Sequence, residues 1–161
     1  MCAMLSALGV VLLYVGSLIE VVDIAMSVIA SLACVFAVIE YGKSSPWLVF
    51  GVTAVLSLIL LPNKSPAVMY TFFFGFYPIL KEKFEKMRTV VSWVLKEVVF
   101  HIALVLIFIA LKYILIMPDM LLSMYVILLI GCELVFVLYD IALTRLISMY
   151  VYKIRKRLKL K

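Results

Sequence analysis

Five ionisable residues in the second half of the chain stand inside or beside long apolar stretches, where charge is costly. His101 and Glu133 lie 17 and 15 residues from Pro118, one on each side of it. If antiparallel helices meet at Pro118, these side chains lie roughly 25 and 22 Å from the turn and can meet. The same counting brings Lys96 and Glu97 to the depth of Asp140. The sequence therefore predicts an intramembrane polar layer that consists of Lys96, Glu97, His101, Glu133 and Asp140.

This polar layer is compatible with more than one role. A histidine beside a carboxylate can exchange a proton with it, so His101 and Glu133 could form a proton relay. Polar pairs in membrane helices also serve commonly as interhelical hydrogen bonds, and Glu133 with His101 and Asp140 with Lys96 would then fix helix register. A third interpretation is a small lipid-modifying enzyme that uses Glu133 and Asp140.

Recognisable catalytic and metal motifs are missing from the sequence. One histidine and three widely separated cysteines offer no zinc spacing, no CxxC pair and no pair of haem ligands. Neither a GxxxxGK[ST] loop, an HExxH motif nor a GxSxG elbow occurs. We therefore expect no enzyme, no cofactor and no metal, and we assign Cys34 and Cys132 to packing.

The composition is that of a membrane protein. Hydrophobic residues make up 68% of the chain and charged residues 15%, and the mean hydropathy is +1.27. A membrane crossing takes roughly 17 to 25 residues, so 161 residues accommodate six crossings only if the loops are short. We predict an all-α polytopic protein, a six-helix bundle that forms one integral membrane domain over residues 1–161.

Turn and capping signals place the boundaries of these elements. Asp23, Ser65 and Asp119 are expected to cap helices, and Pro66 suits a first helical turn. The fourth apolar stretch has only 14 residues, so it must thin the bilayer, extend past Lys81 or bend at Gly75 and Pro78. The predicted spans are 2–19, 24–40, 47–61, 67–80, 98–117 and 120–142, with an interfacial helical segment at 81–97 and a basic tail at 143–161.

The basic residues orient these spans. Of the 15 Lys and Arg residues, only Lys64 and Lys112 fall on one side of the threaded membrane. Basic residues that flank short spans stay preferentially in the cytoplasm. We therefore predict a multi-pass protein of the cell membrane with both termini cytoplasmic. The basic tail is expected to anchor the protein or to contact acidic lipids or a partner, and nucleic-acid binding is not expected.

The predicted outer half contains enough polar and aromatic residues to orient a small molecule. Tyr70 and Phe74 lie one helical turn apart and could line a pocket for a flat ring, although packing and interfacial anchoring are the commoner roles of such rings. For most of the others, solvation or helix capping is the alternative role. The candidate substrate-binding residues are Asp23, Asn63, Lys64, Tyr70, Phe74, Tyr113, Asp119 and Tyr125.

Six short spans, inward termini, almost no loops and no ATP-binding motif resemble the substrate-binding S component of an energy-coupling factor transporter. Ala3 and Ala7 add an Ala-x-x-x-Ala pair on the first span, similar to the motif by which S components pack on a scaffold subunit. The resemblance implies a bacterial transport component that binds a vitamin or a similar solute, with a membrane scaffold and an ATPase pair as partners. The predicted coupling residues are Ala3, Ala7, Lys81, Lys83, Lys86 and Arg88.

A second interpretation from a different class stays open. The apolar surface could instead pack against other helices of a larger complex, with the chain as a structural or regulatory subunit. An outward-facing polar cavity would favour the transport component, and a filled bundle would favour the subunit. A cavity at inner headgroup depth that exposes Glu133 and Asp140 would favour the lipid enzyme.

Overall fold

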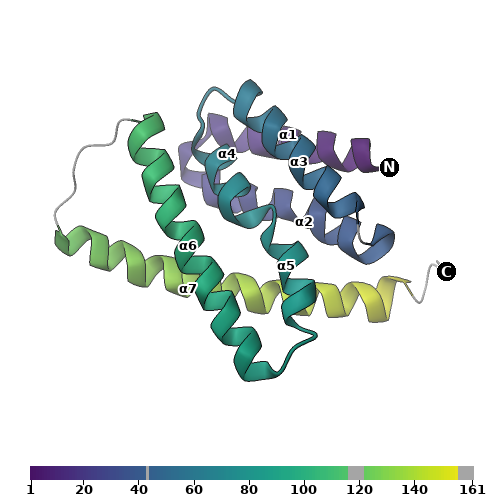
Figure 1. The fold of residues 1–161 in the computed structure, drawn as a ribbon. Helices are drawn as coiled ribbons and strands as arrows, with labels where there is room; N and C mark the ends of the chain where they lie inside the picture. Colours follow the sequence, from purple (N-terminus) through teal and green to yellow (C-terminus); the bar gives the residue numbers. More distant parts are fainter. Residues whose placement is uncertain (43, 116–121, 156–161) are drawn as a thin grey trace. The chain divides into compact units, whose positions relative to one another are not determined.

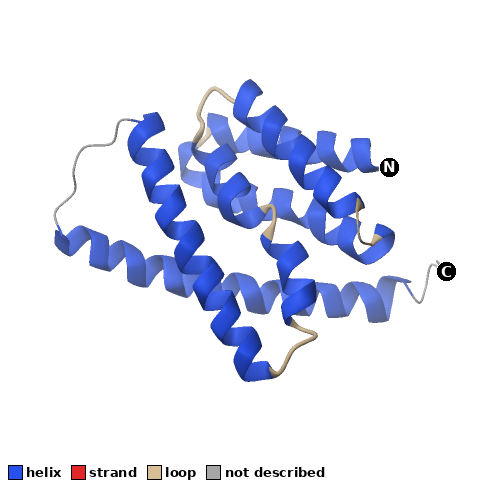
Figure 2. Cartoon of the chain, in the orientation of Figure 1, coloured by secondary structure: helices blue, strands red, loops and turns tan. Residues whose placement is uncertain are grey.

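The computed structural model describes residues 1–42, 44–115 and 122–155, and every regular element among them is helical (Figure 2). The chain divides into two compact units, Met1–Met117 and Pro118–Lys161. The sequence predicts a single integral membrane domain over residues 1–161.

The first three helices of the first unit follow the predicted spans closely. They are α1 (Cys2–Leu18), α2 (Asp23–Tyr41) and α3 (Ser45–Leu60), and they pack against one another (Figure 1). A single 3-10 turn, Glu20–Val22, joins α1 to α2, and Gly42 ends α2 with a φ of 68° that favours glycine. Small residues permit the close approach, because a Cβ atom on Gly16 would lie only 2.8 Å from the Cβ of Met26.

The fourth predicted span is a broken helix. It consists of α4 (Ser65–Met69), a π-helical turn (Tyr70–Phe74) and α5 (Tyr77–Phe84). The interruption expected at Gly75 and Pro78 is present, since Gly75 and Phe76 form a turn between the π-helical turn and α5, and α5 begins directly before Pro78. The segment also extends past Lys81, which makes it longer than the 14 apolar residues suggested.

The segment 81–97 does not form the single interfacial helix that the sequence suggested. Its first residues complete α5, Glu85–Arg88 form a turn, and the rest begins α6 (Thr89–Leu115). Helix α6 has 27 residues and contains neither glycine nor proline, so nothing interrupts it between the turn and the apolar stretch.

The described part of the second unit, residues 122–155, is one long helical segment. Helix α7 (Leu122–Met149) continues as a π-helical segment, Tyr150–Arg155. The part of the predicted tail between 143 and 155 is therefore helical, and residues 156–161 lie outside the described chain.

Among the described residues, three helices are long and apolar enough to cross a membrane: Asp23–Tyr41, Thr89–Lys112 within α6, and Leu128–Tyr152 in the second unit. Two further helices, α1 and α3, are apolar but shorter, with 17 and 16 residues. These lengths are compatible with the predicted membrane protein, since a crossing needs roughly 17 to 25 residues.

Two of the three predicted helix caps are wrong. Val22, not Asp23, is the N-cap of α2, and Lys64, not Ser65, is the N-cap of α4; neither of these two N-cap residues makes a side-chain capping bond. Both predicted residues lie one position inside their helix, because a 3-10 turn leads into α2 and the turn before α4 ends at Lys64. Asp119 lies outside the described residues.

Candidate functional site

Several predicted substrate-binding residues lie at one end of the first unit, where the turn between α1 and α2 meets the start of α4. The hydroxyl of Ser27 joins the two regions, because it donates to the carbonyl oxygen of Asp23 at 2.8 Å and to that of Pro66 at 3.2 Å. Asp23 itself is buried. The structure therefore places the start of α2, where Asp23 lies, beside the start of α4, which Asn63 and Lys64 directly precede.

Asn63 and Lys64 hold the helix ends on either side of their turn. The Asn63 side-chain oxygen accepts a hydrogen bond from the backbone N–H of Ser65 at 3.0 Å. The Lys64 ammonium donates to the carbonyl oxygen of Leu61 at 2.6 Å, directly after the end of α3. A cation at a helix C-terminus is favourable because the last carbonyl groups lack intrahelical partners. Both predicted ligand-binding side chains thus have a structural role.

Tyr70 begins the π-helical turn and is completely buried. Its hydroxyl lies 3.1 Å from the sulfur of Cys34 on α2, which is also buried. The backbone N–H of Gly75 donates to the carbonyl oxygen of Tyr70 at 2.7 Å, a five-residue spacing that defines the π turn. The Tyr70 hydroxyl therefore fixes the broken helix to α2.

Aromatic packing surrounds this break. The ring centroid of Phe50 on α3 lies 6.2 Å from that of Tyr70 and 6.2 Å from that of Phe76. Phe73 packs edge-on against Phe74 at 5.2 Å. Phe74 is buried, and none of the aromatic residues between 70 and 77 is exposed. Packing accounts for these rings, and a role for Tyr70 and Phe74 toward a ligand stays a prediction.

Thr71 is a polar residue of the break that the sequence analysis missed. Its hydroxyl oxygen is buried and has no hydrogen-bond partner among the described residues. A buried polar group without a partner costs free energy, and such groups are few in native structures. In the sequence, the only signals for Thr71 were its polar side chain and its position shortly before Gly75 and Pro78, where the break was expected.

The predicted polar layer is divided between the two units. Lys96, Glu97 and His101 lie on α6, whereas Glu133 and Asp140 lie on α7 of the second unit. The pairs proposed from the sequence, Glu133 with His101 and Asp140 with Lys96, therefore stay predictions. The same applies to the proton relay.

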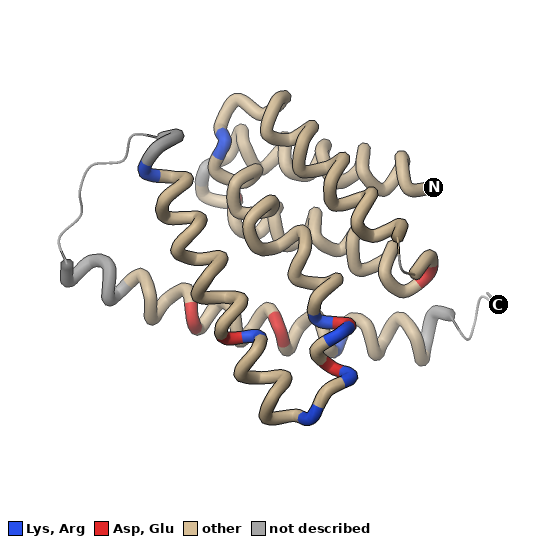
Figure 3. Tube along the Cα trace, in the orientation of Figure 1, with Lys and Arg blue, Asp and Glu red and all other residues tan. Residues whose placement is uncertain are grey.

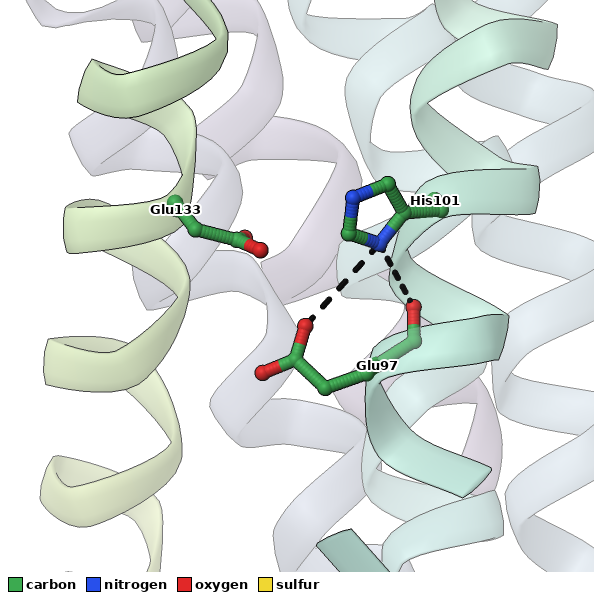
Figure 4. A group of neighbouring side chains, drawn as sticks. All are labelled: Glu97, His101 and Glu133. Carbon is green, nitrogen blue, oxygen red and sulfur yellow. Dashed lines mark hydrogen bonds and ion pairs between the residues drawn. The ribbon is translucent and has the colours of Figure 1, made fainter. Parts of the chain in front are cut away.

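Within α6, Glu97 and His101 form a local pair (Figure 4). The Nδ1 atom of His101 lies 2.9 Å from the backbone carbonyl oxygen of Glu97 and 3.9 Å from its carboxylate. A proton on Nδ1 would be donated to that carbonyl oxygen. Glu133, also drawn in Figure 4, comes from α7.

Lys96 has partners in its own unit that the sequence analysis did not anticipate. Its ammonium lies 3.9 Å from the Glu85 carboxylate and 5.3 Å from the centroid of the Trp93 ring. Lys81 reaches the same oxygen of Glu85 at 2.8 Å. The turn between α5 and α6 therefore brings one carboxylate to two lysines.

The predicted coupling residues fall into three groups. Ala3 and Ala7 are exposed on α1, so a partner helix or lipid can reach them. Lys83, Lys86 and Arg88 are exposed near the turn, where charged residues gather (Figure 3). Lys81 is completely buried, so its side chain is not accessible to a partner as the sequence suggested.

The remaining predicted substrate residues cannot be placed in this site. The side chains of Tyr113 and Tyr125 and the whole of Asp119 lie outside the described part of the chain. Comparisons with protein-family profiles, with curated protein sequences and with solved structures give no match for this chain.

Proposed function

We propose that the chain is a six-span membrane protein with both termini in the cytoplasm and that it binds a small solute beside the broken fourth span. The observation that carries this proposal is the interruption of the helix at Tyr70–Phe76. In lipid, backbone polar groups need internal partners, so irregular backbone occurs only where protein covers it or where it lines a cavity. Transporters commonly build their solute sites from such discontinuous helices.

The side chains around the break suit this role. Thr71 offers a buried hydroxyl that no described residue engages, and Tyr70 offers a phenol ring whose hydroxyl is held by Cys34. Small-molecule sites combine an apolar surface with a few polar groups that fix orientation. We infer that Thr71 donates a hydrogen bond to the solute and that the neighbouring aromatic rings contact its apolar part.

The transport mechanism belongs to the same proposal. The sequence has no ATP-binding motif, so energy would come from partner ATPases through a membrane scaffold subunit, as in the transporters that the chain resembles. Ala3 and Ala7 are exposed one helical turn apart on α1, and small residues at this spacing allow close packing with another helix. This surface is our candidate for scaffold contact.

A structural or regulatory subunit is the second candidate function, and specific contacts favour it. Asn63 and Lys64 are engaged in holding helix ends, and the Ser27 hydroxyl is shared between two backbone carbonyl groups. Polar groups that are satisfied inside the protein are less available to a ligand. On this account the bundle is filled, and its exposed apolar surface packs against other subunits.

A thermal-shift screen of the detergent-purified chain against vitamins, nucleobases and amino acids separates the two candidates. A ligand at 100 times its dissociation constant adds about 2.7 kcal/mol to the free energy of unfolding. We expect at least one compound to stabilise the chain measurably. If no compound does so, the solute-binding function is contradicted and the subunit role is favoured.

The variant Thr71→Val then tests the proposed contact. We expect this variant to retain the stability of the unliganded protein, because it removes a hydroxyl that has no hydrogen-bond partner among the described residues. We expect its affinity for the stabilising compound to fall by about 2- to 12-fold, as for the loss of one hydrogen bond. Thr53→Val is the matched control, since the Thr53 hydroxyl bonds to the Ser6 carbonyl oxygen at 3.5 Å. The control should keep the affinity. Equal affinities in both variants would exclude Thr71 from the site.

A further inference from the structure

The turn between α5 and α6 carries more positive charge than its own acidic residues can neutralise. Glu82 pairs with Lys86 at 2.7 Å, and Glu85 lies between Lys81 and Lys96. In the described part of the chain, no ion pair involves Lys83 or Arg88, and both side chains are exposed. Two free cations, one on the last turn of α5 and one directly before the start of α6, are therefore presented to the surroundings within six residues.

Exposed apolar side chains stand next to these two cations. Met87, Val90 and Trp93 are exposed at 50%, 75% and 39%. A surface that mixes large apolar groups with free cations suits neither bulk water nor the hydrocarbon of a membrane. It suits the boundary between them, where tryptophan is enriched and basic side chains meet phosphate groups.

The position of the turn in the chain agrees with this boundary. Helix α6 starts directly after Arg88, and its segment Thr89–Lys112 is long and, on average, apolar enough to cross a membrane. The residues that precede its apolar stretch must then lie at the membrane surface. This step depends on α6 crossing the membrane and does not depend on the solute proposed above.

We propose that Lys83 and Arg88 bind the phosphate of an anionic phospholipid, with Val90 and Trp93 against the start of its acyl chains. Arginine can contact a phosphate through two N–H groups, and lysine adds a point charge. Each basic residue near an anionic membrane surface adds about five-fold to affinity, so the pair predicts a preference of about 25-fold for anionic over zwitterionic lipid. Lys81 and Lys86 contribute less, because their charges are neutralised within the turn.

The test uses the full chain with Trp47→Phe, which leaves Trp93 as the only tryptophan, in a nonionic detergent. Brominated phosphatidylglycerol and brominated phosphatidylcholine of equal chain length are titrated, and quenching of Trp93 fluorescence is recorded. We expect the anionic lipid to quench Trp93 at a concentration about 25-fold lower than the zwitterionic lipid needs for the same effect. In 0.5 M salt most of this preference should be lost, because the salt screens the charges.

Three variants make the test specific to this site. Lys83→Gln with Arg88→Gln should remove the preference while the thermal stability without lipid stays unchanged, because both side chains are exposed. Lys83→Arg with Arg88→Lys should keep the preference. Lys159→Gln with Lys161→Gln removes the same charge from the basic tail and should also keep it.

Three outcomes would overturn the proposal. The first is an unchanged preference in the Gln variant of Lys83 and Arg88. The second is an equal loss in the tail variant, which would mean attraction to net charge alone. The third is displacement of the anionic lipid by an equal concentration of glycerol phosphate, which would assign the site to a soluble phosphate compound.

Discussion

Replacing Tyr70 with alanine is expected to lower the free energy of unfolding by about 3 to 5 kcal/mol, the range for truncating a buried aromatic side chain. Tyr70 is completely buried, packs against Phe50 and holds Cys34 through its hydroxyl, so the change removes a hydrogen bond and buried packing between the broken helix and its neighbours α2 and α3. The measurement is equilibrium unfolding of the detergent-purified chain by SDS.

A second variant separates the contribution of the Tyr70 ring from that of its hydroxyl. Tyr70→Phe keeps the ring and should cost only about 0.5 to 1.5 kcal/mol for the lost hydrogen bond. Tyr152→Ala is the matched control, because Tyr152 is 79% exposed and its truncation should change stability by less than about 0.5 kcal/mol. A loss for Tyr70→Ala no larger than that for Tyr152→Ala would show that the break is not held as described.

Gly75→Ala is expected to lower the free energy of unfolding by about 1 to 3 kcal/mol through overpacking. A Cβ atom there would lie 2.6 Å from a ring carbon of Phe50 and 2.8 Å from one of Tyr70. The Phe50 ring cannot move away freely, since it also packs against Trp47 and Phe76. The same SDS titration measures the effect.

Gly51→Ala supplies the control on a neighbouring helix. A Cβ atom on Gly51 in α3 would meet nothing within 4 Å. Alanine is the better helix former by about 1 kcal/mol, so this variant should be neutral or slightly stabilising. If both glycine variants changed stability in the same direction and by the same amount, close packing at Gly75 would be refuted.

The sequence predicted the helix ends best where glycine or proline residues flank an apolar stretch. Gly42, Pro46 and Pro62 bracket α3 and the end of α2, and the predicted spans there agree with the helices to within two residues. Gly75 and Pro78 likewise signalled the break in the fourth span. These residues act through the backbone itself, so their effect does not depend on distant neighbours.

Features that depend on tertiary contacts were not predicted. The π turn forms where Tyr70 can reach Cys34, and the attraction of Lys96 to Glu85 requires the chain to reverse between α5 and α6. Asn63 and Lys64 were assigned to a ligand because their polarity is visible in the sequence, whereas their hydrogen bonds to the helix ends are not. The partners of Glu133 and Asp140 stay predictions for the same reason.

The central claim is that the broken helix from α4 through α5 crosses the membrane, and labelling of introduced cysteines tests it most directly. Asn63→Cys and Lys86→Cys are each made in a chain that keeps buried Cys34 but carries Cys2→Ser and Cys132→Ser. In intact cells a membrane-impermeant maleimide should label position 63, and it should label position 86 only after the membrane is opened. Labelling of both positions from the same side would contradict the account.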